Sequence, residues 1–284
     1  MAMLRPAVRC GSRVMSCERP LIMGILNVTP DSFSDGGRYG DTASALTRAQ
    51  EMVAEGADLI DVGGESTRPG ASPVPIQEEC RRIIPVIERL ASDLDRPISV
   101  DTRHAEVMQK AVAAGATLVN DIEALTDPAS LDCLLNHDVA VCLMHMQGEP
   151  ESMQREPYYA GDVVQEVRHF LVGRARWLER QGVGRDRILI DPGFGFGKTR
   201  DHNLALLAHL DALVDSGYAL LAGLSRKSML VDQPGTVAPM HRTGGSLAAM
   251  LWAVQAGASM VRVHDVAESR QALDIWTRLK EKAR

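Results

Sequence analysis

Aromatic residues and long apolar runs are scarce in this sequence. Only 4% of its 284 residues are Phe, Trp or Tyr, while 45% are hydrophobic. That hydrophobic share is ordinary for a globular domain, so the core is expected to consist of aliphatic and Met side chains. The apolar runs all fall short of the roughly 18 residues that a membrane-spanning helix needs. We therefore expect a soluble protein without a membrane partner.

Positive charge and paired cysteines are also lacking. The formal net charge is −6, which argues against a general nucleic-acid binder, because such proteins carry a basic face. The five cysteines form an odd set without a CxxC pair, which excludes a disulfide framework and a zinc-finger pattern. The first residues have no apolar segment typical of a secretory signal. The predicted location is the cytoplasm.

The sequence does contain a regular alternation of short β-branched runs and longer amphipathic stretches. Several of these stretches end in Gly, as at Gly56, Gly115 and Gly257, which is a common way to end a helix. The predicted helices include 42–55, 77–90, 104–114, 162–180 and 246–256. The predicted strands are 21–28, 59–63, 98–101, 117–121, 139–144, 188–191, 219–224 and 259–264.

Eight strands separated by helices favour an α/β protein with a (β/α)8 TIM barrel over an open doubly wound sheet. Nearly every predicted strand is apolar until its last one or two residues and then becomes polar. In a barrel all of these polar ends meet at one rim, whereas an open sheet would spread them along an edge. We predict a β-hairpin extension at 1–19, with strands at 8–10 and 14–17, and a single barrel domain at 20–284.

Two long loops follow the first two predicted barrel strands. One begins at Asn27 and continues through Thr, Pro, Asp, Ser and Gly; the other, 61–73, carries a single cation, Arg68. Each loop could be an ordinary turn or linker. Long loops on a barrel rim are nevertheless typical of functional sites.

Asp101 and Asn120 end two successive predicted strands. Such residues often cap the following helix. If they point inward, they would instead form a hydrogen-bonding floor suited to a planar heterocycle with amidine donors. The sequence leaves both interpretations open.

The segment 190–199 resembles a phosphate loop, but its spacing is wrong. In the Walker pattern a Gly stands where this chain has Pro192, and the dinucleotide pattern requires a Gly where this chain has Lys198. On the last strand, Arg262 and His264 point to the same side because side chains alternate. A buried, functionless Arg is costly, and barrels often bind phosphate near strands 7 and 8, so these two residues indicate an anion site.

Together these motifs closely resemble those of the dihydropteroate synthase family. The matching segments are MGILNVTPDSFSDGG (23–37), DVGGESTRPG (61–70), SVDT (99–102), NDI (120–122), LMHMQG (143–148), DPGFGFGK (191–198), SRKS (225–228) and VRVHDV (261–266). The resemblance implies a Mg²⁺-dependent reaction in which p-aminobenzoate displaces pyrophosphate from 6-hydroxymethyl-7,8-dihydropterin pyrophosphate. The product is 7,8-dihydropteroate, a folate precursor. The resemblance further implies that the C–O bond breaks early and leaves a cationic pterin methylene group. A homodimer is also implied.

Carried over to this chain, the resemblance assigns a role to each matching residue. Pterin would be bound by Asp101, Asn120, Ile122, Met144, Asp191, Gly223 and Lys227. Pyrophosphate would be bound by Asn27, Thr67, Arg68, Arg262 and His264, with Asn27 also the metal ligand. p-Aminobenzoate, and sulfonamides as its mimics, would be bound by Phe33, Ser66, Arg68, Pro69, Phe196, Lys227 and Ser228. The catalytic residues would be Asp101, Lys227, Arg262 and His264.

Two other functions remain as alternatives. A methyltetrahydrofolate:corrinoid methyltransferase shares the carboxylate-and-amide floor but needs no pyrophosphate site. A non-catalytic pterin-binding paralogue would be expected to have lost Arg68, Lys227 or Arg262, and all three are present.

Overall fold

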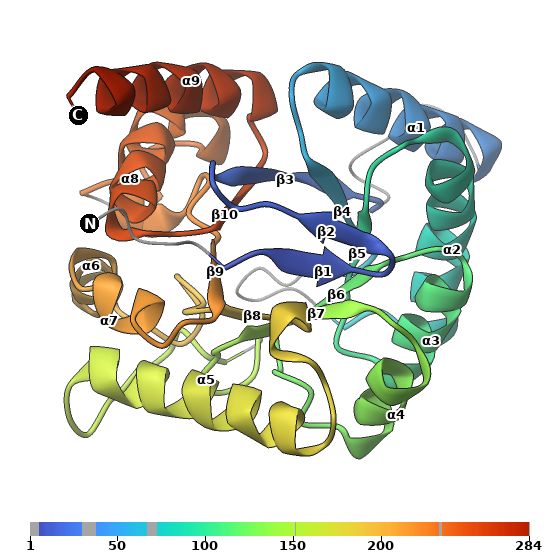
Figure 1. Ribbon diagram of the computed structural model, residues 1–284, viewed down its shortest axis with the longest axis horizontal. Coiled ribbons are helices and arrows are strands. Elements are labelled where there is room, and N and C mark those ends of the chain that lie inside the picture. The colour runs from blue at the N-terminus through green and yellow to red at the C-terminus, as the bar shows by residue number, and fades with distance from the viewer. Residues whose placement is uncertain (1–5, 30–37, 67–72, 151, 233–234, 284) are drawn as a thin grey trace.

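Eight parallel strands form a closed barrel in the computed structural model of the protein (Figure 1). The structure describes residues 6–29, 38–66, 73–150, 152–232 and 235–283. The barrel strands are β3 (Leu21–Asn27), β4 (Leu59–Gly63), β5 (Ile98–Asp101), β6 (Leu118–Asp121), β7 (Ala140–Met144), β8 (Ile188–Asp191), β9 (Ala219–Ala222) and β10 (Met260–Val263). Neighbours in the chain are neighbours in the barrel, and β10 pairs with β3 to close it. The predicted TIM barrel is confirmed.

Helices between the strands surround the barrel (Figure 1). They are α1 (Arg38–Ala54), α2 (Ile76–Asp93), α3 (Ala105–Ala113), α4 (Pro128–Asn136), α5 (Val163–Arg180), α6 (Arg200–Ala208), α7 (Asp211–Val214), α8 (Thr243–Ala256) and α9 (Val266–Lys282). Short 3-10 turns are η2 (Arg185–Arg187), η3 (Ser228–Leu230) and η4 (Pro239–His241). Among the described residues, none of the helices is both long and apolar enough to span a membrane.

Alternation along each strand divides the apolar residues between two cores. In β3, Met23 belongs to a cluster inside the barrel, whereas Ile22 belongs to the larger cluster between strands and helices. In β4, Leu59 is inside and Ile60 is outside. This division follows from the period of two in a strand, and it leaves the carboxyl ends of the strands free to carry polar groups.

The predicted β-hairpin is present, and it closes the amino end of the barrel. β1 (Val8–Cys10) and β2 (Arg13–Met15) are antiparallel, and Gly11 has the positive φ of 61° that their tight turn requires. The second strand begins and ends earlier than the predicted 14–17. Val8 and Met15 pack with the inner barrel cluster. The hairpin therefore covers the amino end of the barrel and leaves the carboxyl end to the loops that follow the strands.

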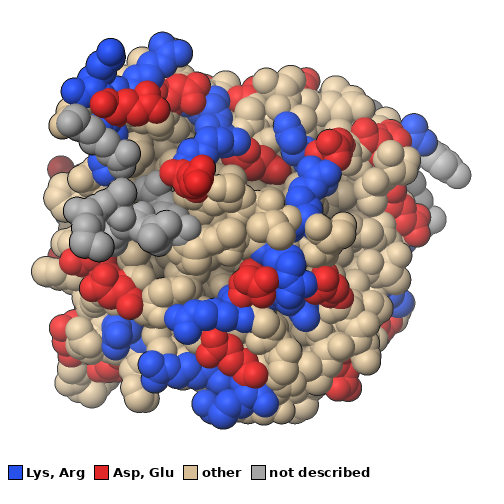
Figure 2. All heavy atoms as spheres, in the orientation of Figure 1, with Lys and Arg blue, Asp and Glu red and all other residues tan. Residues whose placement is uncertain are grey.

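The hairpin is attached to the barrel by ion pairs. Arg9 pairs with Asp138 and Asp186, and Arg13 pairs with Asp95. Basic and acidic side chains are interspersed over this face of the molecule (Figure 2). Such exposed pairs stabilise a fold only weakly, so the buried apolar contacts carry most of the attachment.

Candidate active site

Four polar or small residues stand side by side where consecutive strands end. The parallel register pairs Asn27 of β3 with Gly63 of β4, Gly63 with Asp101 of β5, and Asp101 with Asn120 of β6. A Cβ atom at Gly63 would lie 3.7 Å from Asp101 Oδ2 and 3.9 Å from Asn27 Oδ1. The amide oxygen of Asn27 and the carboxylate of Asp101 therefore face the same position across Gly63.

Arg262 connects this row to a second buried carboxylate. Its Nε donates to Asp61 Oδ2 and its Nη2 to Asp101 Oδ2, both at 2.6 Å. Asn120 Nδ2 also donates to Asp61 Oδ2, at 3.2 Å. Asp61, for which the sequence suggested no role, is thus the link between Arg262 and Asn120. Within the described part of the chain, Oδ1 of both carboxylates lacks a hydrogen-bond partner.

In this cluster, burial and ion pairing shift the pKa values of the side chains in opposite directions. Burial raises the pKa of Asp101 to about 7, although Arg262 opposes the shift. Burial disfavours the Arg262 cation, yet Asp61 and Asp101 hold its pKa above the ordinary value. Arg262 is therefore charged, and it is held by two carboxylates beside the predicted pterin position. It is less free to bind an anion than the sequence alone suggested.

Asp191, at the end of β8, is aimed by the backbone around it. Gly193 N–H donates to its Oδ1 at 2.7 Å, and His145 N–H donates to its main-chain oxygen at 3.0 Å. Burial raises the pKa of Asp191, while the Gly193 N–H and the cations Lys227, Arg262 and Lys198 lower it. The Cβ position at Gly223 is 3.7 Å from Asp191 Oδ2, an ordinary contact distance, so Gly223 adjoins this carboxylate.

An apolar wall stands beside these polar groups. Ile122, Met144, Met153 and Phe196 form a buried cluster that is separate from the two main cores. Lys227 Nζ lies 4.3 Å from the centre of the Phe196 ring, which is within the range of a cation–π contact. The predicted pterin slot, Ile122 and Met144, therefore adjoins Phe196 and Lys227, two residues predicted to bind p-aminobenzoate.

His264 is held by the loop that follows β9. Its backbone N–H donates to Ser225 Oγ at 3.2 Å, and its Nδ1 lies 3.0 Å from the same oxygen. Arg226 has an unusual positive φ of 61° and pairs with Asp265. This turn directs Arg226 toward Asp265. Its two neighbours in the chain face other groups: Ser225 contacts His264, and Lys227 contacts Phe196.

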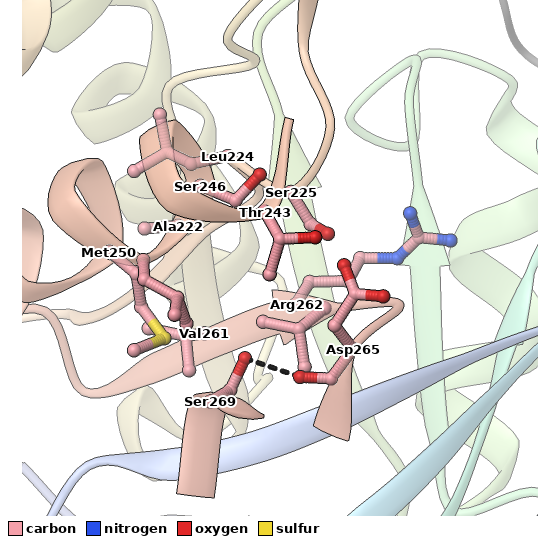
Figure 3. Close-up of a pocket in the computed structure, with 12 residues that line it drawn as sticks. Ala222, Leu224, Ser225, Thr243, Ser246, Met250, Val261, Arg262, Asp265 and Ser269 are labelled. Carbon is pink, nitrogen blue, oxygen red and sulfur yellow. Dashed lines mark hydrogen bonds between the residues drawn. The ribbon is translucent and has the colours of Figure 1, made fainter. Parts of the chain in front are cut away.

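A small cavity lies behind this loop, between β10 and α8 (Figure 3). Its lining includes Ser225, Thr243, Ser246, Val261 and Asp265, and Figure 3 shows the Arg262 guanidinium extending away from it. Its volume is about 10 Å³. Such a cavity holds no more than a single water molecule, so it is not the substrate site.

Glu65, Glu79 and His104 form another polar cluster, at the outer edge of the rim. His104 Nδ1 contacts Glu79 Oε2 at 2.8 Å, Val74 N–H donates to Glu65 Oε2 at 2.9 Å, and Arg103 Nη2 lies 3.4 Å from Glu65 Oε1. Glu79 is thus paired with His104 and Glu65 with Arg103, while Glu79 Oε1 has no hydrogen-bond partner among the described residues.

The remaining predicted residues lie at the edge of the two groups or outside the described residues. Ser66 is half-buried at the end of a described range, and Ser228 is exposed at the start of η3. Phe33, Thr67, Arg68 and Pro69 lie outside the described residues. The structure thus joins Asp101, Asn120 and Arg262 in one network through Asp61, with Asn27 beside it, and it brings Asp191, Gly223, Phe196 and Lys227 together in a second group.

Comparison with known proteins finds a family of pterin enzymes. The model of the family described as "Pterin binding enzyme" matches residues 23–264. Dihydropteroate synthase of Escherichia coli K12 is 45% identical over 261 residues, covering 92% of each chain. The chain belongs to the dihydropteroate synthase family. Because this relative matches over nearly its whole length, the corrinoid methyltransferase alternative is not supported.

Solved structures of dihydropteroate synthases share the fold closely. The Xanthomonas albilineans enzyme with 4-aminobenzoic acid has a TM-score of 0.90 and 49% identity, over 97% of this chain and 98% of that chain. The same enzyme in complex with 7,8-dihydropteroate has a TM-score of 0.87 and 47% identity, over 97% of this chain and 99% of that chain. These dihydropteroate synthases bind a substrate acid and a pterin product.

Proposed function

We propose that this protein joins p-aminobenzoate to 6-hydroxymethyl-7,8-dihydropterin pyrophosphate and releases pyrophosphate and 7,8-dihydropteroate. The observation that carries the proposal is the pair of groups at the barrel mouth. Asp101, Asn120 and Asp191 supply acceptors for the pterin, and Arg262, His264 and Lys227 supply donors beside it. An acidic ring pocket next to cations suits a pterin that carries a pyrophosphate.

In this proposal the pterin lies between the carboxylates and the apolar wall. Asp191 accepts hydrogen bonds from the 2-amino group and N3–H, as a carboxylate accepts two bonds from Arg. Asn120 serves the adjoining ring edge and Lys227 donates to a ring acceptor. Ile122 and Met144 contact the flat face, and Gly223 leaves room at the edge.

The pyrophosphate would be bound by Asn27, Thr67, Arg68, Arg262 and His264. Arg262 uses Nε and Nη2 for its carboxylates, which leaves Nη1 as a donor for a phosphate oxygen. Phe33, Ser66, Arg68, Pro69, Phe196, Lys227 and Ser228 would surround p-aminobenzoate. The aromatic amine is already nucleophilic, so the pocket need only orient it toward the methylene carbon.

Asp101 would stabilise the cationic methylene group that forms when the C–O bond breaks. Asp101 lies in an ion pair with Arg262, and its ionised form would face the positive charge that develops on the methylene group. Charge placed beforehand where the transition state needs it is the largest source of many rate enhancements.

The residues present fit a magnesium ion. Asn27 Oδ1 is a hard oxygen donor, and it lies beside Asp101, whose Oδ1 lacks a partner among the described residues. Mg²⁺ usually takes one or two protein oxygens and completes its shell with phosphate and water. Bound through Asn27, the ion would neutralise charge on the leaving pyrophosphate.

Pyrophosphate release tests both the reaction and the metal. With dihydropterin pyrophosphate, release should require p-aminobenzoate and Mg²⁺, and EDTA should abolish it, because the leaving group needs the cation. Asn27→Ala should raise the Mg²⁺ concentration needed for half-maximal rate. Release that is unchanged when p-aminobenzoate is omitted would show that the reaction assigned here is wrong.

We also propose a cytoplasmic homodimer. Trp252 of α8 and Ile275 and Leu279 of α9 are large apolar side chains that are more than half exposed in the single chain. A second subunit could cover such side chains. Sedimentation velocity should give twice the mass of one chain, and a single-chain mass at micromolar concentration would contradict the dimer.

A further inference from the structure

Lys198 is a buried lysine to which the proposed reaction gives no role. It follows the turn after β8 and is only 2% exposed. Its Nζ donates to the carbonyl oxygens of Gly193 and Phe196 at 3.0 Å and of His145 at 3.1 Å. An ammonium group has three N–H donors, and three carbonyl oxygens match them. His145 Nδ1 is a fourth neighbour at 3.0 Å.

The three carbonyl groups belong to residues that shape both substrate pockets. Gly193 and His145 are the two residues whose backbone N–H groups donate to Asp191. Phe196 carries the ring beneath Lys227 Nζ. One ammonium group therefore connects the backbone that aims the pterin carboxylate to the backbone that bears the aromatic wall.

The turn after β8 does not need a cation merely to set its path. Gly193 and Gly197 have positive φ and lie so close to β7 and its loop that a Cβ atom would be 2.0 Å from His145 O and 2.2 Å from Gln147 O. Tight packing thus already fixes the path of the turn. Three carbonyl dipoles converging on one point would repel one another without a positive charge between them.

The neighbouring groups set the pH range in which Lys198 is a cation. Burial lowers the pKa of Lys198 to about 7; Asp191 opposes this shift and Lys227 adds to it, so the ammonium form predominates below pH 7. Burial, together with Lys198, lowers the pKa of His145 to about 3, so His145 is neutral. The groups that face Asp191 are Lys198 and Gly193 N–H on its own loop, Lys227 after β9, Arg262 on β10 and the Cys142 thiol on β7.

We propose that Lys198 is a positioning residue whose buried ammonium group keeps Asp191 ionised and aimed at the pterin and keeps Phe196 beneath Lys227. This inference rests on the proposed function, since it assigns the pterin to Asp191. Lys198 acts through Asp191 and Phe196 and does not touch the reacting atoms.

The test is pterin affinity as a function of pH, measured calorimetrically with 6-hydroxymethylpterin on the full-length enzyme. Lys198→Met should weaken binding at pH 6, where the Lys198 ammonium form predominates, by about tenfold or more, the effect of losing one charge-assisted interaction. Without the Lys198 cation, Asp191 takes up a proton at higher pH, so the acid limb of the profile should move upward. Lys198→Arg should restore part of the affinity, and the KM for p-aminobenzoate should rise in Lys198→Met.

Two further variants keep the test decisive. Lys110→Met removes a lysine that is paired with Glu106 on α3, far along the chain from β8, and should leave affinity and profile unchanged. Lys198→Gln can still donate to two carbonyl groups, so it should fold even if Lys198→Met does not, and it should show the same displaced acid limb. If folded Lys198→Gln or Lys198→Met kept the wild-type affinity and the wild-type pH profile, the inference about Lys198 would be overturned and the proposed function would stand. A wild-type enzyme that binds no pterin would overturn the proposed function as well.

Discussion

Replacing Asp191 with Asn is expected to lower pterin affinity by about a hundredfold or more while the barrel stays folded. The carboxylate is buried, and the pterin edge would offer it two N–H donors. A hydrogen bond to a charged group is worth about 1.5–3 kcal/mol, and Asn would in addition present an NH₂ group to a donor. Calorimetric titration with a pterin measures the loss directly.

Asp162→Asn provides the matched control for this prediction. It makes the same chemical change at the N-cap of α5, where Asn also caps well, so neither stability nor affinity should change much. Affinity retained in Asp191→Asn would show that the pterin does not bind through this carboxylate. Equal losses in both variants would point to a general effect on folding.

The sequence predicted the barrel well because the period of two residues in the strands and the longer period of the amphipathic helices are both clear in it. Alternation of Ile22 and Met23, or Leu59 and Ile60, between the two cores is what a period of two demands. Strand ends were less certain. The last predicted strands extended to Leu224 and His264, whereas β9 and β10 end at Ala222 and Val263. After β9 the apolar Leu224 continues into a loop that lines a cavity together with Leu247 and Met250 of α8, and hydrophobicity alone does not distinguish such a loop from a strand.

The site was predicted residue by residue, but its connections were not. Asp61 was visible only as a polar strand end, yet it contacts both Arg262 and Asn120. Those contacts join β4 to β6 and β10, and no local pattern encodes a pairing over such a sequence separation. Lys198 was noticed because it imitates a nucleotide motif. Once that motif was rejected, nothing in the spacing indicated that its amine would turn back onto three backbone carbonyl groups.

Arg262→Ala is expected to reduce the free energy of unfolding by about 3–5 kcal/mol, the usual cost of removing one partner from a buried ion pair. Two carboxylates, Asp61 and Asp101, lose their cation at once. Burial already raises the pKa of Asp101 to about 7, and loss of the opposing Arg262 cation should raise it further. The deficit relative to the wild type should therefore be largest above pH 7 and should shrink as the pH falls and Asp101 takes up a proton. Urea unfolding at pH 8 and at pH 5.5 measures both quantities.

Two comparisons separate this explanation from a simple loss of packing. Adding Asp61→Asn to Arg262→Ala should recover part of the lost stability, because one of the uncompensated charges is gone. Arg168→Ala removes a partly buried arginine whose Nε donates to the Ala212 carbonyl, so its smaller deficit should not depend on pH. In the binding assay, Arg262→Ala should lose more affinity for pyrophosphate than for a pterin alone, since Nη1 is the donor proposed for phosphate. Equal losses for the two ligands would mean that Arg262 serves only to hold Asp61 and Asp101 in place, and that the phosphate-binding cations must be sought elsewhere on the rim.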